Sequence, residues 1–146
     1  MSDRSILVIH GPNLNLLGTR EPQTYGTDTV DDHVERVRAV ASGRGLTVDS
    51  FLSNSESEIV GAVQGARNHY SAIIINAGAF THYSWALADA LRTYDGKVIE
   101  VHISNPGARE QFRHTSVISA EVDGTIAGFG GLGYVLAAEA VVSLLG

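Results

Sequence analysis

The stretch Ser5–His10, which reads SILVIH and runs directly into Gly11-Pro12-Asn13, decides the fold. Its four central residues are all large and apolar, with no polar residue at alternate positions. A strand with one solvent-exposed face alternates apolar and polar residues, whereas a strand buried on both faces does not. We therefore expect the chain to begin with a strand inside a sheet that is covered on both sides.

Strand patterns recur along the rest of the chain. Continuous apolar runs predict strands over residues 46–52, 72–75 and 97–103, and a weaker run predicts a fifth strand over 116–119. Each run is separated from the next by a segment with helical spacing or by a polar loop. This alternation is typical of parallel strands joined by crossover helices.

The helical segments carry apolar residues three or four positions apart. Thr29 followed by Asp32 has the spacing of a capping box, and Ser55 with Glu58 repeats it. The last helix, over residues 134–145, is apolar nearly all round, which favours burial on more than one side and hints at oligomerisation. The residues that define the other helices are Val30, Val34, Val37 and Ala41; Ile59, Val63 and Ala66; and Leu87, Leu91 and Tyr94.

These patterns together predict an α/β fold. We expect a flavodoxin-like, doubly wound, five-stranded parallel sheet in a single domain over residues 1–146. A strand order of 2-1-3-4-5 follows only by analogy with other folds of this class. No linker, repeat or low-complexity tract divides the chain.

Composition narrows the possible functions. The 146 residues contain no cysteine, which excludes disulfides, thiolate metal sites and a cysteine nucleophile. A formal charge of −6 argues against a general nucleic-acid partner. The start of the chain has no apolar signal-peptide segment, and no apolar run reaches the roughly 18 residues of a membrane span. We expect a cytoplasmic domain with no membrane or nucleic-acid partner.

Asparagine and histidine residues follow the predicted strands where each strand ends. Asn13 comes after the first strand, Asn54 after the second, Asn76 after the third and His102 at the fourth. An asparagine in such a place is more often a turn residue. Because ligands bind beyond the carboxyl ends of parallel strands, the recurrence favours a polar pocket there.

Glu100 and His102 lie two residues apart in the fourth strand and so share one face of the sheet. Polar groups in an apolar strand are costly unless they are paired or functional, and a purely structural pair is an equal alternative. His82 and His102 have no partner at a spacing typical of metal ligands, so we predict no metal site.

Residues 18–27 form a long loop that is bounded by glycines and carries Arg20 and Tyr25. A loop of this length is often a lid over a site, although a solvated surface loop is an equal alternative. Arg109 and Arg113 lie four residues apart and would point the same way if that segment is helical. A solvated basic turn is the commoner meaning of such a pair, but beside a pocket the two arginines would suit a carboxylate or a developing phenolate.

The glycine run over residues 128–133 satisfies the G-x-G-x-x-G dinucleotide pattern. That pattern needs an acidic residue roughly 20 positions further on, and the chain is too short to supply one. We interpret the glycines as a tight turn into the last helix and predict no cofactor. A flavin-binding or receiver module of the same fold is an alternative, but no phosphate loop follows the first strand.

Longer motifs in this chain resemble the type II 3-dehydroquinate dehydratase family over almost its whole length. The opening segment HGPNLNLLGTREP, which starts at His10, and the pair Tyr25-Gly26 match the family's first signature. Four further segments agree in order and spacing. They are NAGAFTH from Asn76, EVHISNP from Glu100, AREQFRH from Ala108 and IAGFGGLGY from Ile126.

The resemblance implies a reaction and a role for each motif residue. The family removes water from 3-dehydroquinate without a cofactor, in the shikimate pathway or in quinate breakdown. Tyr25 would be the base, with Arg20 and Arg109 favouring its phenolate. His102 would be the general acid, supported by Glu100. Asn13 would help hold a water on the enolate intermediate, and the residues implied in substrate binding are Asn76, His82, Asp89, Ile103, Ser104 and Arg113.

The resemblance also implies a homo-oligomer, a dodecamer of trimers in which Asp89 reaches a neighbouring subunit's site. Asp89 lies opposite the Leu87 and Leu91 stripe, which agrees with that role. A catalytically silent paralogue is a further alternative, which the presence of the implied base and acid weighs against. The chain departs from the family at Tyr83, Trp85, Ala88, Gly107 and Ser57, and none of these is a proposed catalytic group.

Overall fold

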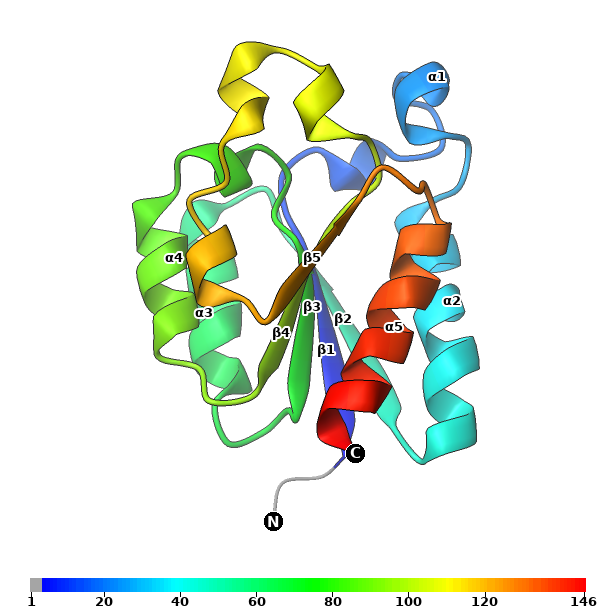
Figure 1. Ribbon diagram of the computed structural model, residues 1–146, viewed down its shortest axis with the longest axis vertical. Helices are drawn as coiled ribbons and strands as arrows, with labels where there is room; N and C mark the ends of the chain where they lie inside the picture. The colour runs from blue at the N-terminus through cyan, green and yellow to red at the C-terminus, as the bar shows by residue number, and fades with distance from the viewer. Residues whose placement is uncertain (1–3) are drawn as a thin grey trace.

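A five-stranded parallel sheet forms the centre of the molecule in the computed structural model, which describes residues 4–146 (Figure 1). The strand order is β2-β1-β3-β4-β5, so the order taken from fold analogy is correct. The first four strands lie within one residue of their predicted limits. The strands are β1 (Ser5–His10), β2 (Thr47–Leu52), β3 (Ala72–Asn76), β4 (Lys97–His102) and β5 (Gly124–Ala127).

Helices cover both faces of the sheet, as the doubly wound fold requires (Figure 1). The helices α2 (Val30–Ala41) and α5 (Leu132–Leu145) lie on one face, and α3 (Glu56–Ala66) and α4 (Trp85–Arg92) lie on the other. Alternate residues of β1 therefore enter different cores. Ile6 and Val8 pack toward α2 and α5, whereas Leu7 and Ile9 pack toward α3 and α4.

Short helical turns occupy the loops between these elements. The single-turn helix α1 (Pro22–Tyr25) stands above the carboxyl ends of the strands (Figure 1). The 3₁₀ turns are Leu14–Leu16, Ser42–Arg44, Gly78–His82, Pro106–Ala108, Gln111–His114 and Ser119–Glu121. Within residues 4–146, no helix is long and apolar enough to cross a membrane.

The capping box predicted at the start of α2 is complete in the structure, whereas the one predicted at the start of α3 has only one of its two hydrogen bonds. At α2, the Thr29 side chain accepts from the Asp32 N–H, and the Asp32 carboxylate accepts from the Thr29 N–H, which completes a capping box. At α3, the Ser55 side chain accepts from the Glu58 N–H. The Glu58 carboxylate does not return to Ser55, because it accepts a hydrogen bond from Ser53 instead.

The predicted fifth strand was wrong. Residues 116–119 form no strand, and the fifth strand is β5, a few residues further on. Ile118 is fully buried, which explains the apolar signal, but the flanking Ser116 and Ser119 donate hydrogen bonds to Glu100. Residues 116–119 therefore contact the Glu100 side chain, and the edge of β4 pairs with β5 instead. The weak strand signal therefore came from a loop that covers a buried carboxylate.

The glycine run leads into the last helix, as its interpretation as a turn predicted. Gly128 N–H donates to His102 O at 3.2 Å and Gly130 N–H donates to Ile103 O at 3.0 Å, which ties the run to the end of β4. The helix α5 begins at Leu132, two residues before its predicted start. It packs on the sheet and on α2, and it leaves Leu132, Leu136 and Leu144 exposed.

Gly11 lets the end of β1 approach β3 closely, so we expect Gly11→Ala to lower stability. Its N–H donates to Asn76 O at 2.8 Å, and an added Cβ would lie 2.3 Å from the backbone oxygen of Ala77. Because a backbone atom cannot move aside cheaply, the free energy of unfolding should fall by about 2 kcal/mol or more in urea denaturation. Gly43→Ala is the control, since nothing lies within 4 Å of its Cβ position. Equal stability of the two variants would contradict the prediction.

Candidate active site

A cavity opens beyond the carboxyl ends of β1, β3 and β4, where the strand-exit pattern predicted a pocket. The predicted site residues come from widely separated parts of the sequence, and the fold brings all of them to this cavity except Glu100 and Asp89. The predicted residues that line it are Asn13, Arg20, Tyr25, Asn76, His82, His102, Ile103, Ser104, Arg109 and Arg113.

The segment predicted as a long loop contains α1, which carries Tyr25 to the cavity. Pro22 begins the turn, where its fixed φ suits a helix start. Gly18 and Gly26 flank it with φ values of 100° and 75°, in the left-handed region that glycine adopts without strain. The glycine-bounded segment is therefore a structured turn that presents one tyrosine.

Tyr25 lies against two guanidinium groups. Arg20 Nη2 donates to Tyr25 Oη at 3.1 Å, and Arg20 Cζ lies 4.3 Å from the ring centroid. Arg109 Cζ lies 5.2 Å from the same centroid. Tyr25 is therefore held between two cationic side chains at the wall of the cavity.

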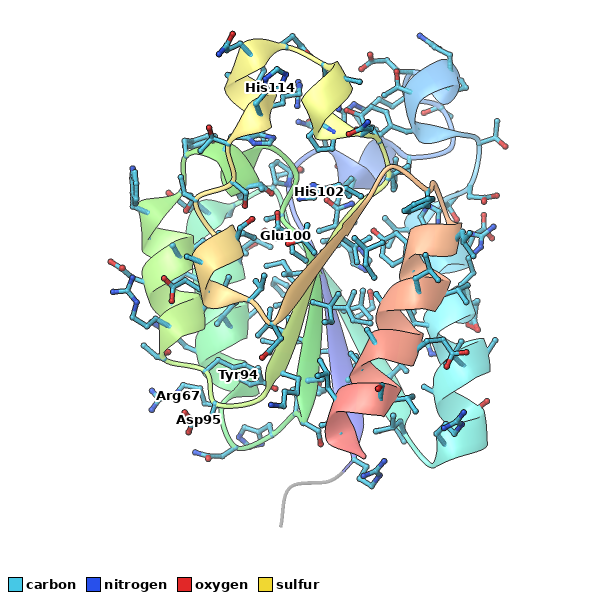
Figure 2. The ribbon with its side chains drawn as sticks, viewed as in Figure 1. Arg67, Tyr94, Asp95, Glu100, His102 and His114 are labelled. Carbon is cyan, nitrogen blue, oxygen red and sulfur yellow. The ribbon has the colours of Figure 1, made fainter. Side chains whose placement is uncertain are left out.

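Glu100 and His102 project from the same face of β4, as their spacing predicted. Figure 2 shows both residues along this strand, with Glu100 deeper in the sheet. His102 Nε2 and Glu100 Oε2 are 2.5 Å apart. Because a carboxylate only accepts, Nε2 carries a hydrogen, and this bond fixes the orientation of the ring. Nδ1 is then the nitrogen available to a bound molecule.

The Glu100 carboxylate is fully buried and accepts four hydrogen bonds. Besides the bond from His102, Ser116 Oγ and Ser119 Oγ each donate at 3.0 Å, and Thr125 Oγ1 donates at 3.4 Å. Burial by itself raises the pKa of Glu100, but the hydrogen bonds from His102 and the two serines outweigh burial and hold the pKa below its ordinary value. The carboxylate is therefore charged at neutral pH.

Two asparagines at strand ends are held by neighbouring groups. Asn13 has a φ of 69°, and its N–H donates to Asn54 Oδ1 at 2.8 Å, so the second strand exit supports the first. Asn76 Nδ2 donates to Tyr134 Oη at 3.1 Å, and Asn76 Oδ1 accepts from Gly78 N–H at 3.2 Å. Both side chains reach the cavity from a fixed backbone.

Arg109 and Arg113 both line the cavity, although no single helix carries them, because Arg109 is extended between two 3₁₀ turns. Arg109 Nη1 donates to Ser104 Oγ at 2.9 Å. Arg113 Nε donates to Glu110 Oε1 at 3.0 Å, and Glu110 itself is exposed. Two guanidinium groups at one end of a cavity suit an anionic ligand such as a carboxylate.

His82 lies beside His102 at the edge of the cavity, with ring centroids 6.4 Å apart and the planes 20° from parallel. His82 Nδ1 donates to Thr115 O at 2.8 Å. Burial lowers the pKa of His82, although the hydrogen bond to Thr115 opposes this effect. His82 is therefore a neutral ring whose second nitrogen can bind a hydroxyl group.

Three polar residues at or near the site lie outside the cavity. His10 is fully buried, with Nε2 at 3.0 Å from Ser50 Oγ, so it belongs to the core. Asn105 accepts from Gly107 N–H and is a turn residue, as the commoner interpretation of such an asparagine holds. Asp89 is exposed on α4 and is absent from this chain's own cavity.

The sequence analysis assigned no individual role to several residues of the site. Ser116, Ser119 and Tyr134 act through contacts between segments far apart in the chain, which no local pattern reveals. The remaining lining residues are mostly small or apolar and resemble ordinary loop residues. They are Pro12, Leu14, Gly78, Ala79 and Pro106.

The residues that line this cavity include no lysine. Lys97, the only lysine in the sequence, begins β4 at the opposite end of the sheet. In the described part of the chain, no three His, Asp or Glu side chains are grouped as ligands for a metal ion.

The fold and the cavity define a flavodoxin-like α/β protein whose site combines a tyrosine between arginines with a carboxylate-bound histidine. The sequence profile of the family Dehydroquinase class II matches residues 4–142. The chain belongs to this family, as its motifs predicted.

Known relatives support this assignment over nearly the full length of the chain. A protein named 3-dehydroquinate dehydratase from Cereibacter sphaeroides is 48% identical and covers 96% of this chain and 95% of its own length. Catabolic 3-dehydroquinase 2 from Neosartorya fischeri is 50% identical, with coverages of 94% and 92%. The crystal structure of type II dehydroquinase from Propionibacterium acnes superposes with a TM-score of 0.90 at 45% identity, covering 97% and 98% of the two chains.

Glu100→Gln should destabilise the protein, because its amide N–H group would face hydroxyl donors. We expect the free energy of unfolding at pH 7 to fall by about 1–3 kcal/mol in urea denaturation. Glu139→Gln is the control, since Glu139 is exposed on α5, and it should change stability by less than about 0.5 kcal/mol.

The pH dependence of this loss has a definite sign. The pKa of Glu100 is lower in the folded state than its ordinary value of 4.5. Its contribution to stability is therefore present above pH 4.5 and is lost as the pH falls through the folded-state value. The stability gap between wild type and Glu100→Gln should narrow in acid. A gap that stays constant with pH would contradict the assignment of a charged, buried Glu100.

Proposed function

We propose that this chain converts 3-dehydroquinate to 3-dehydroshikimate and water, as a hydro-lyase of the cytoplasm. The observation that carries the proposal is that Tyr25, with its two arginines, and His102, whose ring is held by the buried Glu100, line one cavity. The names of the relatives support the same reaction, and they include both 3-dehydroquinate dehydratases and catabolic 3-dehydroquinases. The pathway is accordingly shikimate biosynthesis or quinate breakdown.

The first step is removal of a proton from the carbon next to the substrate ketone by the Tyr25 phenolate. The hydrogen bond from Arg20 and the nearby guanidinium of Arg109 offset the negative charge on Tyr25 before the step. Other tyrosines are poorly suited to this role. Burial raises the pKa of Tyr134 to about 12, and a hydrogen bond to Asp49 raises the pKa of Tyr70 to about 12.

The second step expels the hydroxyl group. The C–H electron pair first becomes an enolate, and a water held with the help of Asn13 stabilises the enolate oxygen. The C–O bond then breaks as protonated His102 donates from Nδ1, so the hydroxyl leaves as water and a C=C bond forms. Tyr25 has gained one proton and His102 has lost one, and exchange through water restores both groups.

The rest of the cavity binds the substrate. Arg113 supplies a cation for the substrate carboxylate, while Asn76, His82 and Ser104 offer hydrogen-bond partners to its hydroxyl groups. The Ile103 backbone and side chain complete the wall. We also propose that residues 18–27 act as a lid, because α1 stands above the strand ends and brings Tyr25 to the cavity.

A direct assay tests the reaction. Product formation creates a conjugated enone carboxylate, so ultraviolet absorbance should rise when the purified protein meets 3-dehydroquinate. Tyr25→Phe should lower kcat by about a hundredfold or more, because general-base catalysis contributes 10²–10⁴-fold. Tyr70→Phe is the control, since Tyr70 lies outside the cavity and its hydroxyl donates to Asp49 Oδ2 at 2.6 Å. No absorbance change with folded wild-type protein would refute the proposal.

We propose that the active form is a homo-oligomer, a dodecamer built from trimers, in which Asp89 completes a neighbour's site. Three observations support this. Asp89 is exposed, it does not line its own chain's cavity, and Tyr83 and Trp85, close to it in the sequence, are exposed aromatic side chains. Large apolar side chains left exposed on one face are typical of contact surfaces.

Subunit complementation tests the shared site. Tyr25→Phe and Asp89→Asn should each be nearly inactive alone. When the two variants are co-expressed, a site built from the Asp89→Asn subunit's Tyr25 and the Tyr25→Phe subunit's Asp89 is intact. With random assembly about a quarter of the sites are restored, and activity should recover accordingly. A co-expressed mixture as inactive as its parts would show that each subunit builds its site alone.

A further inference from the structure

The side-chain amide of Asn76 is held at both ends by other groups of the protein. Its Oδ1 accepts from Gly78 N–H at 3.2 Å, and its Nδ2 donates one hydrogen to Tyr134 Oη at 3.1 Å. Only the second Nδ2 hydrogen is left, and Asn76 lines the cavity. A flipped amide would place Nδ2 against the Gly78 N–H, so the two bonds together specify one orientation.

Tyr134 is itself fixed within the core. It lies in the first turn of α5, is fully buried and is not part of the cavity wall. Its ring stacks on His33, with centroids 4.7 Å apart and planes 10° from parallel. His33 Nδ1 accepts from Arg36 Nη1 at 3.0 Å, and Arg36 Nη2 is bound to Asp28 at 2.6 Å. The hydroxyl of Tyr134 therefore has a defined position.

The chemistry of Tyr134 is limited to hydrogen bonding. Burial raises its pKa to about 12, and the bond from Asn76 lowers the pKa only in part. The hydroxyl is neutral at the pH of turnover and acts toward Asn76 as an acceptor. It can act on the site only through another residue, and Asn76 is the lining residue that it contacts.

We propose that Tyr134 is a positioning residue for substrate binding, which fixes the Asn76 amide so that its free Nδ2–H points at a hydroxyl group of the substrate. This rests on the proposed dehydratase function. Asn76 would make the same contact in the ground state and in the transition state, so its loss should raise KM more than it lowers kcat. A tyrosine that only fills the core would change stability and leave KM unaltered.

Tyr134→Phe removes the hydroxyl and keeps the ring that stacks on His33. We expect KM for 3-dehydroquinate to rise by about three- to tenfold, the effect of one neutral hydrogen bond, with kcat within about twofold of wild type. Tyr94→Phe is the matched control. Tyr94 is also a buried tyrosine, and its Oη donates to Tyr70 O at 2.6 Å, but it lies at the opposite end of the molecule (Figure 2). It should lower the melting temperature without changing KM.

A double-mutant cycle connects the effect to Asn76. In an Asn76→Ala background, Tyr134→Phe should have no further effect on KM, because the amide that it positions is gone. A wild-type KM for Tyr134→Phe, or an undiminished effect in the Asn76→Ala background, would overturn the proposal. Wild-type turnover is measured in the same series, so failure of the dehydratase function itself would be seen separately.

Nuclear magnetic resonance of the wild-type protein gives a second measurement. It depends neither on whether a variant folds nor on catalytic activity. The two Nδ2 protons of Asn76 should differ, with the one bound to Tyr134 exchanging slowly with solvent because its acceptor is fully buried. Two protons that exchange equally fast would show that the amide is not held, and would overturn the proposal whatever the kinetic result.

Discussion

The buried carboxylate of Glu100 is the constraint around which much of this molecule is arranged. An ionised carboxyl inside a sheet costs several kcal/mol unless hydrogen bonds replace the water it has lost. The donors come from His102 on the same strand, from Ser116 and Ser119 in the loop that follows the active-site arginines, and from Thr125 in β5. Satisfying Glu100 thus brings this loop back over β4, and the same bonds fix the imidazole that faces the cavity.

The parallel sheet supplies the rest of the site by geometry. Crossover connections, most of them helical, return every strand in the same direction, so the polar residues that follow β1, β3 and β4 gather at one edge. Gly11 allows the chain to approach Ala77 more closely than any side chain would permit. Most of the site therefore lies on rigid strand ends, whereas Tyr25 comes from a single helical turn between glycines.

Tyr25 and Tyr134 are the same residue type, but they lie in different surroundings and have different proposed roles. Tyr25 lies at the cavity against the guanidinium groups of Arg20 and Arg109. Tyr134 lies in the core against a neutral histidine, where burial keeps its hydroxyl protonated. In the function proposed above, the first exchanges protons with the substrate and the second only orients Asn76. The two roles follow from the surroundings of each tyrosine in the fold and not from the residue type.

The sequence by itself determined the fold class, four of the five strands, the main helices and the family, because period, caps and contiguous motifs are local properties of the chain. It also placed Glu100 and His102 on one face. The tertiary structure alone decided that residues 116–119 serve Glu100 rather than form a strand, that His10 belongs to the core, and that Tyr134 holds Asn76. Each of these depends on a hydrogen bond between residues distant in the chain, and a buried polar group takes whichever partner the packed fold brings within reach.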